Sequence, residues 1–258
     1  MTPVDFSRGA GRYDGRHGAR LAPDAAAQLA DTAGLGKHAC ILDLGAGTGR
    51  VAVALAALGH RVFAVDVAQA MLQLLRKKAD GLPVHAIVAE GARLPFAAAR
   101  FDAIVLARVL YLMPDWQEIV RETIRTISPD GRLLHEWGNG EADEEWVQLR
   151  EKARALFESA GVARPFHPGV RTEADVERCL AREGWRQTAA VHLGPGPGLT
   201  LAGFLARIVD GECSYTWSVP ADVQARCLPE LRAWAETKFD LAREMPIPRE
   251  MIWRVYER

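Results

Sequence analysis

Residues 41–50 place an apolar strand immediately before a glycine loop and a helical pattern. The first four of them are apolar except for Asp43, and Gly45, Gly47 and Gly49 then follow at every second position. Glycine permits positive φ and lets a ligand approach the backbone closely, while the following helix directs its first N–H groups at the same place. The segment therefore predicts an α/β unit with a site for a nucleotide-like ligand, although a glycine loop alone is also compatible with a tight structural turn.

In the rest of the chain, short apolar runs alternate with helical patterns, which favours parallel strands joined by helices. The predicted strands are residues 40–44, 62–65, 84–89, 101–107, 132–137, 188–193 and 251–256, with a turn at 128–131 before the fifth strand. We therefore predict an α/β fold, a Rossmann-like doubly wound sheet of seven mostly parallel strands. The last strand is expected to be antiparallel, and a helical insertion or lid is expected beside the sheet.

The length and composition agree with one domain. The chain has 258 residues, of which 49% are hydrophobic and 25% charged, and these values exclude disorder as the main state. We predict a single domain over residues 1–258, with a cofactor-binding core at 6–137 and helical lid or substrate elements at 138–187 and 199–245. The formal net charge of −1 gives no bulk attraction to nucleic acid or to an anionic membrane.

The four cysteines indicate a reducing compartment. Cys40, Cys179, Cys213 and Cys227 lack the paired spacing of a disulfide framework or a metal site. The amino-terminal residues lack the apolar core of a signal peptide, and no apolar run approaches the roughly 18 residues that a membrane-spanning helix needs. These features predict a cytoplasmic protein with no membrane span and no bound metal.

Asp66 ends the predicted second strand and adds a second component to the candidate site. In a doubly wound sheet an acidic residue at this place accepts hydrogen bonds from ribose hydroxyls, although a helix cap is also compatible. The glycine spacing is G-x-G-x-G rather than the G-x-G-x-x-G of dinucleotide-binding proteins. Asp43, two residues before the first glycine, would repel a diphosphate and would suit a cationic amino-acid group. An adenosine ligand other than a dinucleotide is therefore favoured.

The ordered motifs of the chain resemble those of the class I S-adenosylmethionine-dependent methyltransferases. The similarity is to the small-molecule group related to quinone-biosynthesis methyltransferases, also called methyltransferase type 11, and it covers residues 6–137. The segments that carry it are residues 6–16, 43–49, 66–72, 90–96, 101–105, 110–115 and 128–134. The resemblance implies S-adenosyl-L-methionine as cofactor, S-adenosyl-L-homocysteine as product and a small-molecule methyl acceptor.

The resemblance also implies which residues hold the cofactor. The glycine loop would hold the methionine end, Asp66 the ribose hydroxyls, and the residues after the second and third strands the adenine. Glu90 stands where the family usually has Asp, which keeps the acceptor group on a longer side chain. The implied cofactor-binding residues are Tyr13, Asp43, Gly45, Ala46, Gly47, Gly49, Asp66, Val67, Met71, Glu90, Gly91, Ala92, Ala107, Arg108 and Val109.

The catalytic candidates are Tyr111 and His135. Tyr111 stands where relatives often have His, so a His-based proton transfer is not implied there. His135 and Glu136 alternate along the fifth strand, so only one of them can face the site. Methyl transfer relies mainly on positioning, and a general base is needed only when the acceptor must lose a proton. Further polar or aromatic candidates near the site are Trp137, Trp146, His167, Tyr215 and Trp217, with packing as the alternative role for the aromatic ones.

The favoured hypothesis is a methyltransferase that acts on a small molecule by in-line displacement. A nicotinamide-dependent oxidoreductase is a second hypothesis, which the strand, the glycines and Asp66 permit. A non-catalytic S-adenosylmethionine-binding module is a third, since no base is evident in the sequence. Methylation of RNA or protein is a fourth, for which the arginines between Arg8 and Arg20 would have to contact phosphate.

Overall fold

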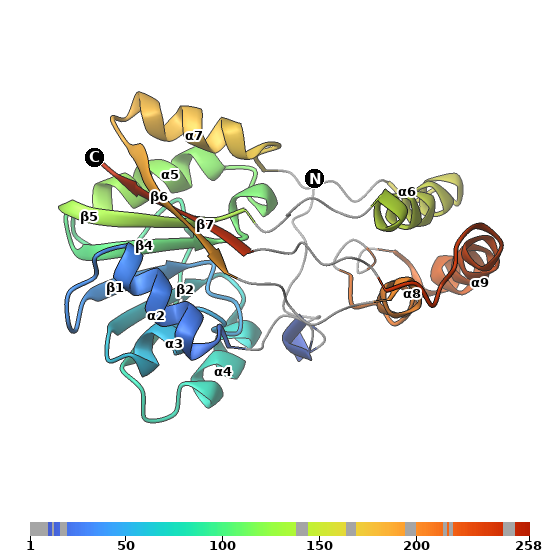
Figure 1. Ribbon diagram of the computed structural model, residues 1–258, viewed down its shortest axis with the longest axis horizontal. Coiled ribbons are helices and arrows are strands. Elements are labelled where there is room, and N and C mark those ends of the chain that lie inside the picture. Colours follow the sequence, from blue (N-terminus) through green and yellow to red (C-terminus); the bar gives the residue numbers. More distant parts are fainter. Residues whose placement is uncertain are drawn as a thin grey trace. The chain divides into compact units, whose positions relative to one another are not determined.

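The computed structural model describes residues 10–11, 13–15, 20–137, 144–163, 169–193, 200–213, 216, 219–244 and 251–258. The chain divides into two compact units. The first comprises Met1–Gly138, His167–Leu193 and Met251–Arg258, and the second comprises Asn139–Phe166 and Gly194–Glu250 (Figure 1). The predicted fold class concerns the first unit.

The first unit is built on one seven-stranded sheet. Its strands are β1 (Cys40–Leu44), β2 (Arg61–Asp66), β3 (Val84–Val88), β4 (Phe101–Ala107), β5 (Ile127–Glu136), β6 (Arg186–Leu193) and β7 (Met251–Glu257). They are ordered β3-β2-β1-β4-β5-β7-β6, and β7 is antiparallel to both β5 and β6. Because the other pairings are parallel, the predicted α/β fold with an antiparallel last strand is confirmed.

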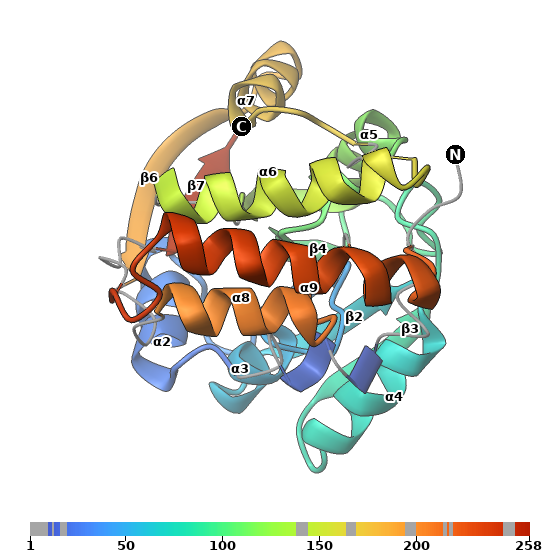
Figure 2. The same ribbon diagram turned by 90° about the vertical axis from the view of Figure 1, so that its right-hand side faces the viewer.

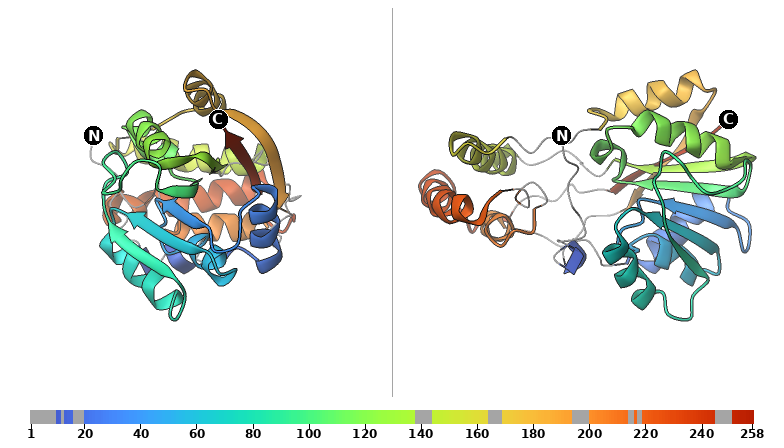
Figure 3. Two further views of the ribbon diagram at one scale, coloured as in Figure 1. Left: turned by 90° about the vertical axis from the view of Figure 1, so that its left-hand side faces the viewer. Right: turned by 180° about the vertical axis from the view of Figure 1, so that it is seen from behind.

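Helices cover both faces of this sheet (Figure 3). On one face lie α2 (Pro23–Thr32), α3 (Ala52–Ala57) and α4 (Gln69–Lys78), which bury Leu29, Leu55 and Leu75 in one apolar cluster. On the other face lie α5 (Trp116–Thr126) and α7 (Glu173–Arg182), which contribute Ile119 and Val176 to a second cluster. Two covered faces explain why β1 is buried at every position, as is typical of parallel sheets.

The strand order places a ligand crevice at the carboxyl ends of β1 and β4. The chain proceeds outward from β1 to β2 and β3, and then crosses back so that β4 pairs with β1 on its other side. In open α/β sheets, ligands bind where the strand order reverses in this way. The glycine loop follows β1 directly, so the fold brings it to this crevice.

One local prediction is wrong. Residues 128–131 do not form a separate turn before the fifth strand, because β5 runs continuously over Ile127–Glu136. The register of its pairing with β4 shifts between Phe101 and Ala103, so the extra residues are absorbed as an irregularity within the ladder. Pro129 and Gly131, which suggested the turn, lie within this irregular part of the strand.

The second unit is helical. It contains α6 (Glu144–Ser159), α8 (Leu201–Val209) and α9 (Ala221–Lys238), which lie side by side in Figure 2. They share an apolar core that includes Trp146, Phe204 and Leu231, and the rings of Trp146 and Phe204 lie 4.4 Å apart. Within the described part of the chain, α9 included, no helix is long and apolar enough to cross a membrane.

The segment 138–187, expected to be part of a helical insertion, is divided between the units. Residues Asn139–Phe166 belong to the second unit, whereas α7 and the start of β6 belong to the first. This division follows from burial, because Val176 and Leu180 of α7 pack in the same cluster as β4 and β5. The role of the helical elements as a lid stays a prediction.

Thr172 caps the amino-terminal end of α7. Its Oγ1 accepts a hydrogen bond from the backbone N of Asp175 at 3.2 Å. We expect Thr172→Ala to lower the free energy of unfolding by about 1 kcal/mol, because a helix N–H then loses its partner. Chemical denaturation would measure this loss. Thr172→Ser, which keeps the hydroxyl, should lie close to the wild type, and an equal loss in both variants would contradict the capping role.

Candidate active site

The glycine loop adopts a conformation that requires its glycines. Gly45, Gly47 and Gly49 have φ values of +74°, +54° and +90°, a region that other residues rarely adopt. A Cβ on Gly45 would lie 2.5 Å from Cγ2 of Val109, so the space beside the backbone is also closed to a larger residue. The backbone N atoms of Gly45 and Ala46 donate to Val65 O at 2.8 and 3.0 Å, which holds the loop against β2.

Asp66 links the end of β2 to this loop. Its Oδ2 accepts a hydrogen bond from Gly47 N at 2.9 Å, and its Oδ1 accepts from Ala68 N at 2.8 Å. Burial raises the pKa of Asp66, while these backbone N–H groups act in the opposite direction. A carboxylate offers about four lone-pair sites, so Asp66 retains acceptor capacity for hydroxyl groups of a ligand.

Asp43 is a buried carboxyl group directly beneath the loop. Its side chain is 2% exposed, and its Oδ2 accepts a hydrogen bond from the backbone N of Ala52, at the start of α3, at 3.0 Å. Burial raises the pKa of Asp43 to about 7, although the charge of Arg50 and the Ala52 N–H oppose this shift. The charge of Asp43 is therefore sensitive to pH and to any cation that a ligand brings.

Two arginines meet one buried glutamate at the ends of β4 and β5. Glu136, which is 1% exposed, pairs with Arg50 through Oε2, and its Oε1 lies 3.1 Å from Nε of Arg108. The geometry of the second contact is that of an ion pair without a hydrogen bond. Arg108 has a φ of +58°, and its backbone N donates to Glu136 O at 2.8 Å. Strained backbone of this kind tends to occur at functional sites.

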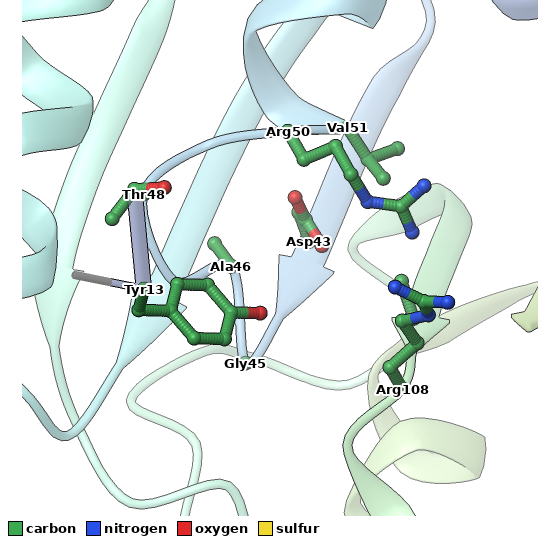
Figure 4. Close-up of a pocket in the computed structure, with 9 residues that line it drawn as sticks. Tyr13, Asp43, Gly45, Ala46, Thr48, Arg50, Val51 and Arg108 are labelled. Atoms are coloured by element: carbon green, nitrogen blue, oxygen red, sulfur yellow. The ribbon is translucent and has the colours of Figure 1, made fainter. Parts of the chain in front are cut away.

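Several of these groups border a pocket beside the glycine loop. Figure 4 shows the Tyr13 ring beside the loop, and the guanidinium groups of Arg50 and Arg108 pointing toward each other on the far side of Asp43. The pocket is lined by Tyr13, Asp43, Gly45, Ala46, Thr48, Arg50, Val51, Ala107 and Arg108. Six of these are predicted cofactor residues, namely Tyr13, Asp43, Gly45, Ala46, Ala107 and Arg108.

The other predicted cofactor residues lie outside this pocket lining. They are Gly47, Gly49, Asp66, Val67, Met71, Glu90, Gly91, Ala92 and Val109. Val67 and Glu90 are exposed after β2 and β3, whereas Met71 is buried against Ala10 and Ala68. Gly91 is closely packed, since a Cβ there would lie 3.1 Å from Leu44 Cδ2.

Tyr111 lies next to the arginine–glutamate group. It belongs to the short 3-10 helix η1 (Leu110–Leu112), and its ring meets the edge of Trp137 with centroids 5.8 Å apart. Burial raises the pKa of Tyr111 to about 12, with the charges of Arg108 and Glu136 as smaller influences. The phenol therefore keeps its proton near neutral pH and can donate a hydrogen bond, but it cannot act there as a base.

His135 faces away from the glycine loop. It shares the sheet face of Leu133 and α7, whereas Leu134 and therefore Glu136 face the cluster of α2 and α3. Burial lowers the pKa of His135 to about 4, so its imidazole is neutral, and its Nδ1 lies 3.9 Å from Oε1 of Glu173. Of the two alternating residues, Glu136 is the one that belongs to the candidate site.

Sequence patterns assigned no role to Arg50, which follows the third glycine directly and lies two residues before α3. The pairing of Arg50 with Glu136 joins positions 86 residues apart and becomes evident only in the folded chain. Three other candidates, His167, Tyr215 and Trp217, lie outside the described residues. Within the described residues, no group of His, Cys, Asp and Glu is arranged to hold a metal ion.

Comparison with known proteins agrees with this geometry. Residues 42–135 match a family described as the methyltransferase domain. A demethylmenaquinone methyltransferase of Clavibacter sepedonicus is 36% identical over 95 residues, which cover 36% of this chain and 39% of the relative. The protein of the same name from Corynebacterium glutamicum is 36% identical over 157 residues, which cover 56% of this chain and 66% of the relative. The chain thus spans only 39% of the length of the first of these relatives.

Solved structures share the fold. One from Anabaena variabilis, described as a methyltransferase from an antibiotic biosynthesis pathway, superimposes with a TM-score of 0.65 at 18% identity. The match covers 94% of this chain and 99% of that chain. At this identity the similarity concerns the fold alone, since one fold hosts many activities.

Proposed function

We propose that the chain, whose residues 42–135 match the methyltransferase domain, is a class I S-adenosylmethionine-dependent methyltransferase that transfers a methyl group from S-adenosylmethionine to a small-molecule acceptor. The observation that carries this proposal is the joint geometry of the glycine loop and Asp66. Asp66 Oδ2 is bonded to Gly47 N, so the carboxylate and the loop form one continuous rim for an adenosine ligand.

The residues present fit this cofactor. Gly45 and Ala46 of the glycine loop line the pocket, and the Tyr13 ring lies beside Gly47, 3.6 Å from the position of a Cβ on that glycine. Asp66 would bind the ribose hydroxyls, with Val67, Met71, Glu90, Gly91 and Ala92 on the adenine side. The pocket at the other end offers both signs of charge, because Asp43, Arg50 and Arg108 line it. A zwitterionic amino acid such as the methionine end requires such a mixture.

The protein's own contribution to the reaction is mainly positioning. When bound, the cofactor supplies an electrophilic methyl group on its sulfonium. Holding a nucleophile in line with this group and excluding water contributes about 7–11 kcal/mol in well-oriented systems. Tyr111, protonated near neutral pH, would donate a hydrogen bond that orients an acceptor oxygen or nitrogen. His135 would not take part, because it is buried on the other sheet face.

Further features of the proposal concern partners and location. A net charge of −1 supports an acceptor other than nucleic acid, because non-specific nucleic-acid binding depends on basic surfaces. All four cysteines are free, and three of them are buried, which supports a reducing compartment such as the cytoplasm.

Calorimetric titration of the purified protein with S-adenosylhomocysteine tests the proposal, with NAD at the same concentrations as the control. We expect saturable binding of S-adenosylhomocysteine, accompanied by a rise in melting temperature that grows with ligand concentration, and no binding of NAD. Binding of NAD alone would favour the oxidoreductase hypothesis instead. If S-adenosylhomocysteine binds, transfer of a labelled methyl group to a panel of small acceptors distinguishes an enzyme from a binding module.

A further inference from the structure

Gly169 and Val170 lie directly against the backbone of η1. Gly169 N donates to Tyr111 O at 3.1 Å, and Val170 N donates to Leu110 O at 3.3 Å. A Cβ on Gly169 would lie 2.6 Å from Met113 O and 2.8 Å from the carbonyl carbon of Tyr111, and closer still to Leu110 O. All three are backbone atoms, which cannot rotate away as a side chain can. Only glycine permits this approach.

The chain just before and within η1 contacts the candidate site. Val109 packs beside Gly45, where its Cγ2 lies 2.5 Å from the position of a Cβ on that glycine. Arg108 is bonded to Glu136 through its backbone N at 2.8 Å and through the ion pair of its side chain. Any displacement of η1 therefore moves contacts of both the glycine loop and the arginine–glutamate group.

The segment that supports η1 is itself held to the sheet. Val170 is 4% exposed and packs in the cluster that contains Leu110 and Val176. Shortly after it, α7 begins at the Thr172 cap, and Glu173 pairs with Arg254 of β7. Gly169 and Val170 therefore connect η1 to α7 and the sheet through continuous packing contacts. Contacts of this kind can couple the positions of separate elements.

We propose that Gly169 is a positioning residue of the methyl-transfer site. By packing without a side chain on the backbone of η1, it holds residues 108–111 in the place where Val109 meets Gly45 and Arg108 meets Glu136. The inference rests on the proposed function, because it takes the pocket beside Gly45 as the cofactor site. Gly169 acts through η1, and it is absent from the lining of that pocket.

Gly169→Ala tests this inference, with S-adenosylhomocysteine as the probe. We expect its dissociation constant to rise about tenfold or more, since overpacking against fixed atoms displaces the neighbouring backbone. We also expect faster hydrogen exchange in a peptide covering residues 105–115. Both measurements are made where each variant is fully folded, so that lost stability alone does not change them.

Two variants separate positioning from lost stability. Leu29→Ala removes buried apolar atoms of α2 from the cluster that does not contain η1. Gly36→Ala is a glycine substitution with no atom within 4 Å of the added Cβ. Both should bind S-adenosylhomocysteine within about twofold of the wild type, a change below 0.5 kcal/mol. A tenfold loss in Leu29→Ala as well would mean that general destabilisation explains the effect, and would overturn the inference.

The remaining outcomes also decide the inference. Wild-type affinity and exchange in Gly169→Ala would overturn it. If the wild type binds no S-adenosylhomocysteine, the proposed function fails instead, and exchange at residues 105–115 still decides whether Gly169 holds η1. If Gly169→Ala does not fold, the wild type is compared with and without S-adenosylhomocysteine. When S-adenosylhomocysteine is added, hydrogen exchange should slow at residues 169–170 together with residues 108–113. Slower exchange at residues 108–113 alone would overturn the inference.

Discussion

Asp43→Asn is expected to stabilise the cofactor-free protein above pH 7 and, at the same time, to weaken binding of S-adenosylmethionine. Burial raises the pKa of Asp43 from an ordinary value of 3.8 to about 7. Between these values the folded protein binds one proton that the unfolded chain has released, so stability falls as pH rises through this window. A shift of this size corresponds to about 4 kcal/mol above pH 7.

The amide of Asn removes this dependence. Asn retains one carbonyl oxygen that can accept the hydrogen bond from Ala52 N, and it carries no charge to bury. Thermal unfolding at pH 5 and pH 8 should therefore show a gain in Asp43→Asn over the wild type that is larger at pH 8. Asp130→Asn, at an exposed position, controls for the loss of one negative charge. An equal gain at both pH values would contradict the buried-carboxyl explanation.

Weaker cofactor binding in the same variant follows from the proposed function. The carboxylate of Asp43 lies under the loop that would hold the methionine end of the cofactor. Without it, no buried carboxylate remains under this loop among the described residues, because Glu136 is already paired with Arg50 and Arg108. The wild type should also bind S-adenosylmethionine more tightly at pH 8 than at pH 6, because the ionised form of Asp43 favours a cationic ligand. Titration calorimetry at both pH values would measure this, and a flat pH dependence in the wild type would exclude Asp43 as the group responsible.

Asp66→Ala is expected to lower the affinity for S-adenosylmethionine and S-adenosylhomocysteine by about 10- to 150-fold. Hydrogen bonds to a charged acceptor contribute about 1.5–3 kcal/mol, and here the ribose contacts and the bond to Gly47 N would be lost together. The fold should persist, because Asp66 is partly exposed at a strand end. Calorimetric titration gives the affinity, and circular dichroism checks the fold.

Asp102→Ala provides a matched control for Asp66→Ala. Asp102 also accepts a backbone hydrogen bond across the sheet, from Cys40 N at 2.7 Å, but it lies at the amino-terminal end of β4, opposite the crevice. Its removal should leave the affinity for S-adenosylhomocysteine unchanged. Equal affinity of Asp66→Ala and the wild type would show that the ribose is bound elsewhere, whereas equal losses in both variants would indicate a general loss of structure.

Elements with strong local constraints were predictable from the sequence. The apolar run of β1, the alternating glycines and Asp66 identified the strand, the loop and the acid at the next strand end, because strand burial and positive φ leave few residue choices. The turn predicted at 128–131 failed, because its residues lie in a strand whose irregular register depends on the partner β4.

The sequence by itself determined the order of strands and helices, the glycine loop and the carboxylates at the ends of β1 and β2. Each depends on periodicity or on steric limits within a few residues. Tertiary structure alone decided that Glu136 rather than His135 faces the loop, that Arg50 and Arg108 share this carboxylate, and that Gly169 supports η1. These relations join residues far apart in the chain, and they arise from strand register and packing between elements, which alternation along one strand cannot specify.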